Sequence, residues 1–450
     1  MQLQRDAMPS DGALAILISL IGLSVAFGNA ADQNEPQLTY HRFDVVEKEG
    51  RVVATRPIPA ETPPRWARDV PQKPAAWSRD STAGKAFFLD PIPFVRPPLD
   101  KGEPFYSHNH QPAITWLNNG DLLAIWYSTN SESGTELTVL ASRFRADHKT
   151  WDPSSEFFKA SRRNMHGSSI FHDGKKTVYH FNGMGPEDGK GWSKLVLLMR
   201  SSDDNGVTWT SAEPISNGAD YELRNQVIAG TLMTREGTLI QACDATPGGE
   251  GPSAVHVSSD GGKSWTDPGG DIRGIHAGVC ELTDGRLMAL GRGQPIDNKM
   301  PISLSTDLGR SWNYRASPFT PIGGGQRLVL LRLNEGPLLL CSFTSGDLRN
   351  PTAHGMTFRD DAGSEFIGHG LFAALSFDDG ETWPVRKLLT PGRGDYNGGG
   401  HTGPFTASRS VAEHAGYLAA TQSPDDTIHL ISSRLHYRFN LAWLNSSKPN

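Results

Sequence analysis

The sequence is poor in cysteine, has no strong excess of either charge and holds a single long apolar run. Its three cysteines, Cys243, Cys280 and Cys341, fit neither a disulfide framework nor a zinc site in number or spacing. We therefore predict that each is a small buried core residue. The formal net charge of −6 argues against a nucleic-acid-binding protein, so an anionic substrate would need a few local arginines or histidines.

The apolar run at residues 13–27 is too short for a comfortable membrane span. Small residues follow it at Gly28 and Ala30, as at a secretory cleavage site. This pattern predicts a signal peptide over residues 1–30, cleaved after about Ala30. The protein is then expected to be secreted or periplasmic, with no membrane anchor after cleavage. Residues 31–74 are polar and contain prolines, which indicates a lead-in before the main domain.

Glycine and proline are abundant, with 48 and 31 residues, which predicts many turns between short strands. Short apolar runs such as 122–127 and 338–343 are bounded by the residues that usually end strands. No amphipathic helix stands out. We therefore expect an all-β protein.

An octapeptide of the form S-x-D-x-G-x-[ST]-W occurs at residues 202–209, 258–265, 305–312 and 376–383. The Asp carboxylate can accept hydrogen bonds from turn amides, and the Gly can take the positive φ of a tight hairpin. The Trp ring can then cover the gap to a neighbouring hairpin. We therefore assign the four Asp residues to structural turns rather than to catalysis.

The tryptophans that end these octapeptides, with one earlier candidate, lie 47 to 71 residues apart. They are Trp151, Trp209, Trp265, Trp312 and Trp383. Each interval suits one four-stranded blade of a β-propeller. The octapeptide resembles the Asp box of sialidases and related propellers. That resemblance implies a six-bladed, sialidase-like β-propeller over residues 75–450, with seven blades as the alternative.

The same resemblance implies a site with three arginines for a substrate carboxylate, a Tyr nucleophile assisted by a Glu, and an Asp acid/base. Tyr417, followed by residues 424–428, resembles the sialidase nucleophile before the last hairpin. Residues 281–287, which lead to Arg292, resemble the segment that carries the second arginine.

Other positions depart from the sialidase pattern. Residues 106–113 place His110 where the first arginine normally stands. His276 is the closest residue to the position of the partner Glu, and no Asp stands clearly in the loop after Tyr127. Because histidines stand at two of these positions, we also consider a site that uses histidine for catalysis.

His108 and His110 are two residues apart on a predicted strand, so both side chains point to one face. Neutral His can accept a proton near neutral pH, and Tyr can donate one. The further candidate site residues are Arg163, His166, Tyr179, Asn182, Arg200, Arg224, His276, Arg292, Arg327 and His401.

This set suits β-elimination of a uronate-containing polysaccharide and resembles the site of ulvan lyases, which are Asp-box propellers described as using His, Tyr and Arg. In that hypothesis His110 or His108 is the base or contacts the carboxylate, and Tyr179 is the acid. Arg200 and Arg292 bind the anion, because Arg presents a bidentate fork to a carboxylate.

Two alternatives stay open beside the lyase. The first is an exo-sialidase-type glycoside hydrolase with Tyr417 as nucleophile. The second is a non-catalytic carbohydrate-binding propeller. The expected partner is an acidic polysaccharide or a sialoglycan, and no cofactor is required, although His108 and His110 could hold a metal.

Overall fold

The protein was analysed as a computed structural model, which describes residues 37–78, 84–189, 194–215, 219–245, 251–360 and 362–446. The signal peptide predicted over residues 1–30 lies outside these ranges. The described residues are almost all in strands and loops, with short helices only at η1 (Arg65–Ala67) and α1 (Leu441–Asn445). Neither helix is long and apolar enough to cross a membrane, nor is any other in the described residues.

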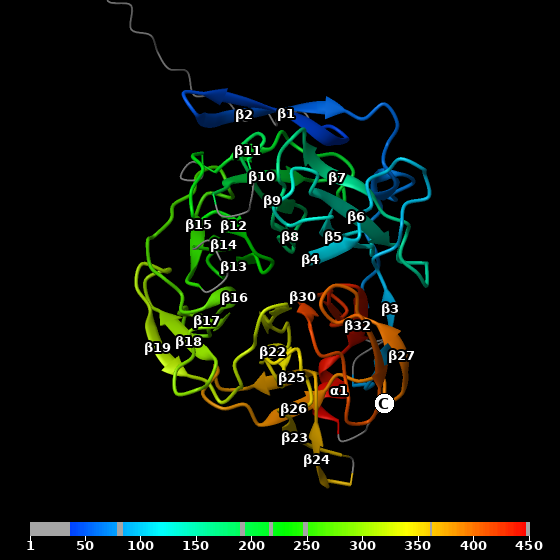
Figure 1. Cartoon of the computed structure of the whole chain (residues 1–450), viewed down its shortest axis with the longest axis vertical. Helices are drawn as coiled ribbons and strands as arrows, with labels where there is room; N and C mark the ends of the chain where they lie inside the picture. The colour runs from blue at the N-terminus through cyan, green and yellow to red at the C-terminus, as the bar shows by residue number, and fades with distance from the viewer. Residues whose placement is uncertain are drawn as a thin grey trace, which may run out of the picture. The chain divides into compact units, whose positions relative to one another are not determined.

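Six sheets of at least four strands form the main body of the described chain (Figure 1). The first contains β4 (His108–Trp116), β5 (Leu122–Thr129), β6 (Thr138–Phe144) and β7 (Ser155–Ala160), with β1 (Tyr40–Lys48) and β2 (Arg51–Pro59) at its outer edge. The second contains β8 (Ser168–His172), β9 (Val178–Met184), β10 (Val196–Ser202) and β11 (Glu213–Pro214).

The third and fourth sheets follow in chain order. The third contains β12 (Gln226–Val227), β13 (Leu232–Met233), β14 (Leu239–Asp244) and β15 (Ser253–Ser258). The fourth contains β16 (Ile275–Glu281), β17 (Leu287–Arg292), β18 (Pro301–Ser305) and β19 (Asn313–Ala316).

The fifth and sixth sheets complete the ring. The fifth contains β21 (Val329–Arg332), β22 (Leu338–Phe343), β25 (Leu371–Ser376) and β26 (Val385–Leu388), and the sixth β30 (Ala419–Gln422), β31 (Ile428–Ile431), β32 (Leu435–Phe439) and β3 (Phe88–Pro93). Three further pairs are β20 (Gln326–Arg327) with β29 (Gly416–Tyr417), β23 (Met356–Arg359) with β24 (Glu365–Gly368), and β27 (Gly394–Asn397) with β28 (Pro404–Ala407).

Contacts between neighbouring sheets run around the ring and close it. β4 contacts β8, β9 contacts β12, β14 contacts β16, β16 contacts β21, β21 contacts β30, and β30 contacts β4. The last sheet is completed by β3 from the N-terminal part, which pairs antiparallel with β32. Four-stranded sheets that repeat around a central axis, with only short exposed edges, are the architecture of a β-propeller. The predicted all-β fold is therefore confirmed.

The Asp boxes form the predicted turns. In the first box, Asp204 Oδ1 accepts from the Thr208 amide at 2.9 Å, and Ser202 Oγ donates to the same oxygen at 2.8 Å. The same pattern recurs in the other three boxes. Trp209 is buried and packs edge-on against Phe157 of the preceding sheet, with ring centroids 5.5 Å apart. The box residues therefore hold adjacent sheets together.

The described part of the predicted lead-in is folded against the first sheet. β1 pairs parallel with β7, and Trp66 Nε1 donates to the Glu156 carbonyl oxygen at 2.9 Å. Cys243, Cys280 and Cys341 are buried and unbridged, as the sequence predicted.

Candidate functional site

Polar side chains gather near the N-terminal ends of the inner strands, at one end of the propeller axis. The parallel pairing of β20 with β29 sets Arg327 beside Tyr417. β4 contacts β29, which brings the start of the first sheet to the same place. The side chains that meet here are those of His108, His110, Tyr127, Glu132, His166, Gln226, Asp244, His276, Arg292, Arg327, His401 and Tyr417.

The first group in this cluster is a chain of three side chains, Tyr417, His276 and Asp244, which we call the Tyr417 arm. The Tyr417 hydroxyl lies 2.7 Å from His276 Nε2. His276 Nδ1 lies 2.5 Å from Asp244 Oδ2. Because a carboxylate only accepts hydrogen bonds, Nδ1 carries the proton and Nε2 is free to accept from the tyrosine hydroxyl.

The protein fixes His276 through its backbone as well as its ring. The His276 residue has φ +55°, and the pairing of β16 with β17 shifts register between Ile275 and Gly278. The His276 amide donates to Asp244 Oδ1 at 2.7 Å, so one carboxylate contacts both the backbone and the ring of the same residue. A bulge of this kind re-aims a side chain and is found next to active sites.

Burial sets the protonation of the Tyr417 arm. It raises the pKa of Tyr417 above the usual value, while Arg292 acts in the opposite direction. It also lowers the pKa of His276, while Asp244 acts to raise it. At neutral pH the proton therefore resides on the tyrosine, and His276 is a neutral acceptor beside it.

The second group, which we call the Tyr127 arm, contains Tyr127, Glu132 and His108. Glu132 Oε1 accepts from the Tyr127 hydroxyl at 2.5 Å and lies 3.1 Å from His108 Nε2. The contact with His108, followed by the effects of His166 and the Tyr127 hydroxyl, holds the pKa of Glu132 well below its usual range, whereas burial acts to raise it. Burial and the Glu132 charge raise the pKa of Tyr127 well above its usual value. Glu132 is therefore an anion that fixes one Tyr and one His.

His110 lies between the two arms. Its ring centroid is 3.9 Å from that of Tyr417, 5.0 Å from that of His401 and 5.3 Å from that of His108. His110 Nδ1 is 2.9 Å from Ser433 Oγ, whereas Nε2 has no hydrogen-bond partner in the described part of the chain. Burial, followed by His401 and His108, lowers its pKa well below the usual value, so His110 is neutral.

Two arginines supply positive charge at Tyr417. Arg292 Nη1 donates to the Tyr417 hydroxyl at 3.1 Å and to the Gln326 carbonyl oxygen at 3.0 Å. The Arg327 guanidinium carbon is 5.2 Å from the Tyr417 ring centroid. Burial lowers the pKa of Arg327 to about 10, which leaves it charged at neutral pH. Its Nη1 is buried and lacks a partner among the described residues, which is a position suited to an anionic ligand.

The structure brings eight of the predicted site residues into this cluster. They are His108, His110, His166, His276, Arg292, Arg327, His401 and Tyr417. His166 stacks near Tyr127, with ring centroids 5.1 Å apart, and burial lowers its pKa to about 4.

Arg200 and Tyr179 do not join the cluster, which corrects the roles expected for them. Arg200 lies between the first two sheets, where its guanidinium is fully buried among Tyr40, Phe157, Phe158 and Trp209. Tyr179 packs in the core between the second and third sheets, with its hydroxyl 3.4 Å from the Gly261 carbonyl oxygen. Both side chains are part of the packing between blades, so their positions do not suit anion binding or proton donation.

Arg163, Arg224 and Asn182 are likewise engaged in contacts that hold loops and strands. Arg163 donates to the Tyr221 hydroxyl at 2.5 Å, and Arg224 bonds the carboxylates of Asp267 and Asp271. The Asn182 amide donates to the carbonyl oxygens of residues 165 and 167. Their donors already have protein acceptors, so the structure does not place them as ligands of a substrate.

Sequence reasoning missed Tyr127, Glu132 and Asp244. Glu132 stands in the loop after Tyr127, where the sialidase pattern places an Asp, so a pattern that allows either carboxylate includes it. Asp244 ends the buried strand β14, and only the contact between β14 and β16 brings it to His276. No local pattern signals that pairing.

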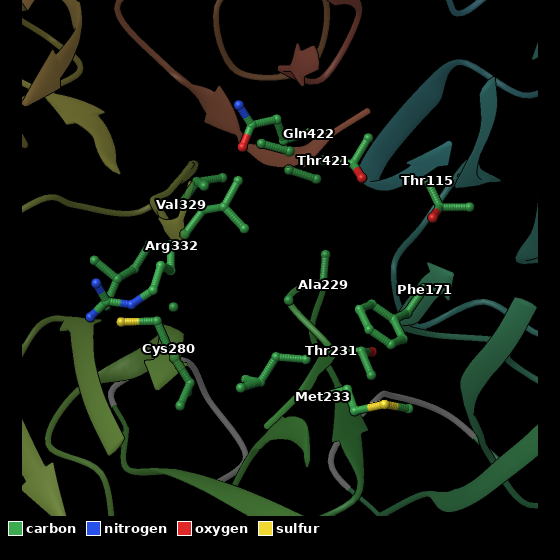
Figure 2. Close-up of a pocket in the computed structure, with 18 of the residues that line it drawn as sticks. Thr115, Phe171, Ala229, Thr231, Met233, Cys280, Val329, Arg332, Thr421 and Gln422 are labelled. Atoms are coloured by element: carbon green, nitrogen blue, oxygen red, sulfur yellow. The ribbon is translucent and has the colours of Figure 1, made fainter. Parts of the chain in front are cut away.

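The other end of the axis has a different character. A cavity of about 640 Å³ lies along the same inner strands, and Figure 2 shows side chains from all six sheets around it. Among them are Thr115, Phe171, Met233, Cys280, Val329 and Thr421. These side chains lack a Tyr–His–carboxylate chain, so the candidate chemistry lies at the Tyr417 end. Within the described ranges, no group of three or more His, Cys, Asp or Glu is placed to hold a metal ion.

A closed propeller with Asp-box turns and a Tyr, His and Arg cluster at its axis defines a sialidase-like protein. The chain belongs to the family described as BNR repeat-like domain, which matches residues 120–430. A sialidase of Micromonospora viridifaciens is 24% identical over 389 residues, covering 74% of this chain and 51% of the relative. The chain thus spans about half the length of that curated relative.

Solved structures show the same fold. The Hadza microbial sialidase Hz136 superposes with a TM-score of 0.53 at 18% identity, covering 75% of this chain and 66% of that one. Trypanosoma rangeli sialidase gives a TM-score of 0.52 at 14% identity, covering 79% of this chain and 60% of that one. A protein of unknown function from Dyadobacter fermentans gives a TM-score of 0.51 at 13% identity, covering 79% of this chain and 99% of that one.

Proposed function

We propose that this protein is a retaining exo-glycosidase of sialidase type that hydrolyses sialoglycans with Tyr417 as its nucleophile. The observation that carries this proposal is the position of the Tyr417 hydroxyl, 2.7 Å from His276 Nε2 and 3.1 Å from Arg292 Nη1. A nucleophile, a base in hydrogen-bond reach and a third group that orients the base together form the arrangement needed for covalent catalysis.

In the first step the Tyr417 oxygen attacks the anomeric carbon while its proton passes to His276 Nε2. The resulting imidazolium lies against the Asp244 carboxylate, which compensates a charge that burial otherwise disfavours. Arg292 stabilises negative charge on the tyrosine oxygen as the proton leaves. His276 therefore does here what a carboxylate would do as base.

The substrate carboxylate is held by the cations beside Tyr417. Arg327 packs against the Tyr417 ring, and its Nη1, which has no partner among the described residues, can donate to the carboxylate. Arg292 donates to the hydroxyl of the same tyrosine. His110 Nε2 can donate to the same anion, because Ser433 can then supply the hydrogen bond that Nδ1 accepts. Two arginines and one neutral histidine form a weaker anion site than three arginines would.

The relatives support this proposal, because the curated match and two of the solved structures described above are named sialidases. The direct test is hydrolysis of a fluorogenic sialoside, followed by proton NMR of the sugar first released. Release with retained anomeric configuration is expected, since a covalent intermediate gives two inversions. Inversion would contradict a tyrosine nucleophile, and a folded protein inactive on every sialoside would contradict the substrate.

The second candidate is β-elimination of a uronate polysaccharide, which the neutral His110 and its unpartnered Nε2 favour as a base. The test is the ultraviolet absorbance of the conjugated, unsaturated uronate during incubation with uronate-rich polysaccharides. A rising signal with no release of sialic acid would replace the sialidase proposal by the lyase. If neither assay responds, carbohydrate binding without catalysis is the better account.

A further inference from the structure

Hydrolysis of a glycosidic bond to a sugar requires a proton donor for the departing oxygen, and the candidates are the side chains of the Tyr127 arm and the histidines beside it. Glu132 accepts hydrogen bonds from two partners, and its pKa is held well below the usual range. It is therefore ionised at neutral pH and carries no proton to give. The Tyr127 hydroxyl is buried and already donates to Glu132, so it is unavailable to a substrate.

The remaining candidates are His108, His110 and His401, because His276 already serves Tyr417 and burial lowers the pKa of His166 to about 4. His110 is buried, and burial together with two neighbouring histidines lowers its pKa, which keeps it neutral. The pKa of His401 is also lowered, by burial and by His108. His108 differs, because its ring nitrogen contacts a carboxylate and its side chain is 26% exposed. It can therefore both gain a proton from water and reach a substrate.

We propose that His108 is the catalytic acid/base of this site and that Glu132 positions its ring. Glu132 accepts from His108 Nε2, which leaves Nδ1 as the donor to the leaving-group oxygen. This inference rests on the proposed function. It specifies a natural substrate whose leaving group is a sugar or alkyl alcohol, because such poor leaving groups need protonation.

The proton and electron balance is complete with these residues. In the first step the Tyr417 oxygen bonds to the anomeric carbon, and the glycosidic carbon–oxygen bond breaks with its electron pair moving to the oxygen. That oxygen takes the Nδ1 proton of His108. In the second step Nδ1 takes a proton from water as the water oxygen bonds to the anomeric carbon, and Tyr417 departs and recovers its proton from His276.

Four groups face the ring of His108. They are Glu132 at 3.1 Å, with the rings of His110, Tyr127 and His401 at 5.3, 5.8 and 6.0 Å. Glu132 is the nearest anion, and its contact with Nε2 orients the ring. In the variant Glu132→Gln the ring loses the carboxylate that accepts from Nε2, so activity on a disaccharide sialoside should fall by less than in the variant His108→Ala.

The decisive experiment compares two sialosides in the variant His108→Ala. Activity on a disaccharide sialoside should fall by about 10²–10⁴-fold, the usual contribution of a general acid. The first step on sialyl fluoride, whose leaving group needs no proton, should fall by less than about 10-fold on the same reasoning. His401→Ala is the matched control and should change both substrates by a similar factor.

Other outcomes separate the two proposals. Equal losses of the variant His108→Ala on both substrates, with the wild-type protein active, would overturn the role of His108 and leave the Tyr417 nucleophile standing. A Glu132→Gln variant with a larger loss than His108→Ala and the same leaving-group dependence would instead make Glu132 the acid. A wild-type protein inactive on both sialosides would contradict the proposed function itself.

Discussion

The two arms of the site contain the same kinds of residue in a different order and at a different depth. In the Tyr417 arm the order is Tyr–His–Asp, and His276 and Asp244 are buried. In the Tyr127 arm the order is Tyr–Glu–His, and the side chains of Glu132 and His108 are 41% and 26% exposed. The tyrosine therefore faces a neutral base in one arm and an anion in the other.

This difference in depth gives the arms different chemistry. A buried His–Asp pair is shielded from water, so His276 stays neutral until it takes the proton of the tyrosine. This behaviour suits the activation of a nucleophile. A solvated Glu–His pair exchanges protons with water, which suits donation to a leaving group. His110 separates them and contacts the ring of Tyr417 more closely than that of Tyr127, at 3.9 against 6.1 Å.

The largest expected effect distinguishes the two tyrosines. Tyr417→Phe removes the nucleophile and should lower kcat/KM by about 10⁴-fold or more, whereas Tyr127→Phe should cost about 10-fold or less. Steady-state rates on a fluorogenic sialoside measure both, with circular dichroism as the control for folding. Equal losses in the two variants would remove the distinction between the arms.

The next effect concerns the carboxylate behind His276. Asp244→Asn should lower kcat by about 10²–10⁴-fold, because the ring loses the partner that fixes its tautomer. Asp244 also acts to raise the pKa of His276, so the acidic limb of the pH–rate profile should move to lower pH in the variant. A limb that stays in place would show that His276 is not the titrating base.

A smaller effect is expected for the arginine beside Tyr417. Arg327→Gln should raise KM by about 10- to 100-fold, through loss of one charge-assisted bond to the substrate carboxylate. Arg200→Gln is the matched control, since burial lowers the pKa of both arginines to about 10. The Arg200 variant should lower Tm and leave KM unchanged. A similar rise in KM in both variants would indicate a general loss of structure.

The smallest effect is a pH dependence of stability at His166. Burial lowers its pKa to about 4 from a model-peptide value of 6.5, so between these values the unfolded chain binds more protons. The free energy of unfolding should therefore fall as the pH falls through this window. His166→Gln should recover about 1 kcal/mol of the loss between pH 6.5 and 5.5, measured by urea unfolding. An unchanged slope would show that the pKa of His166 is the same in the folded and unfolded states.

The fold was predictable because its signal is local and repeated. Each Asp box contains its own hydrogen-bonded turn, such as that from Ser202 to Thr208, so eight residues are enough to recognise it. The predicted runs 122–127 and 338–343 are strands β5 and β22 for the same reason. The pairing of β3 with β32 could not be predicted, because it joins segments from opposite ends of the described chain.

The site was predictable only in part. His108, His110, Arg292 and Tyr417 stand next to motifs that can be read along the chain. The chain from Tyr417 through His276 to Asp244 depends instead on contacts between residues 32 to 141 positions apart. Arg200 misled the prediction because a buried arginine that packs between blades looks the same in sequence as one that binds an anion.

The most direct test of the central claim is mass spectrometry of the protein after incubation with 2,3-difluorosialic acid activated as the fluoride. Trypanosoma rangeli sialidase has been solved with this sugar as a covalent intermediate. We expect one added 3-fluorosialyl group on the peptide that contains Tyr417, with loss of the anomeric fluoride, and no added group in the variant Tyr417→Phe. An adduct on another residue, or no adduct from a protein that hydrolyses sialosides, would contradict the assignment of Tyr417 as nucleophile.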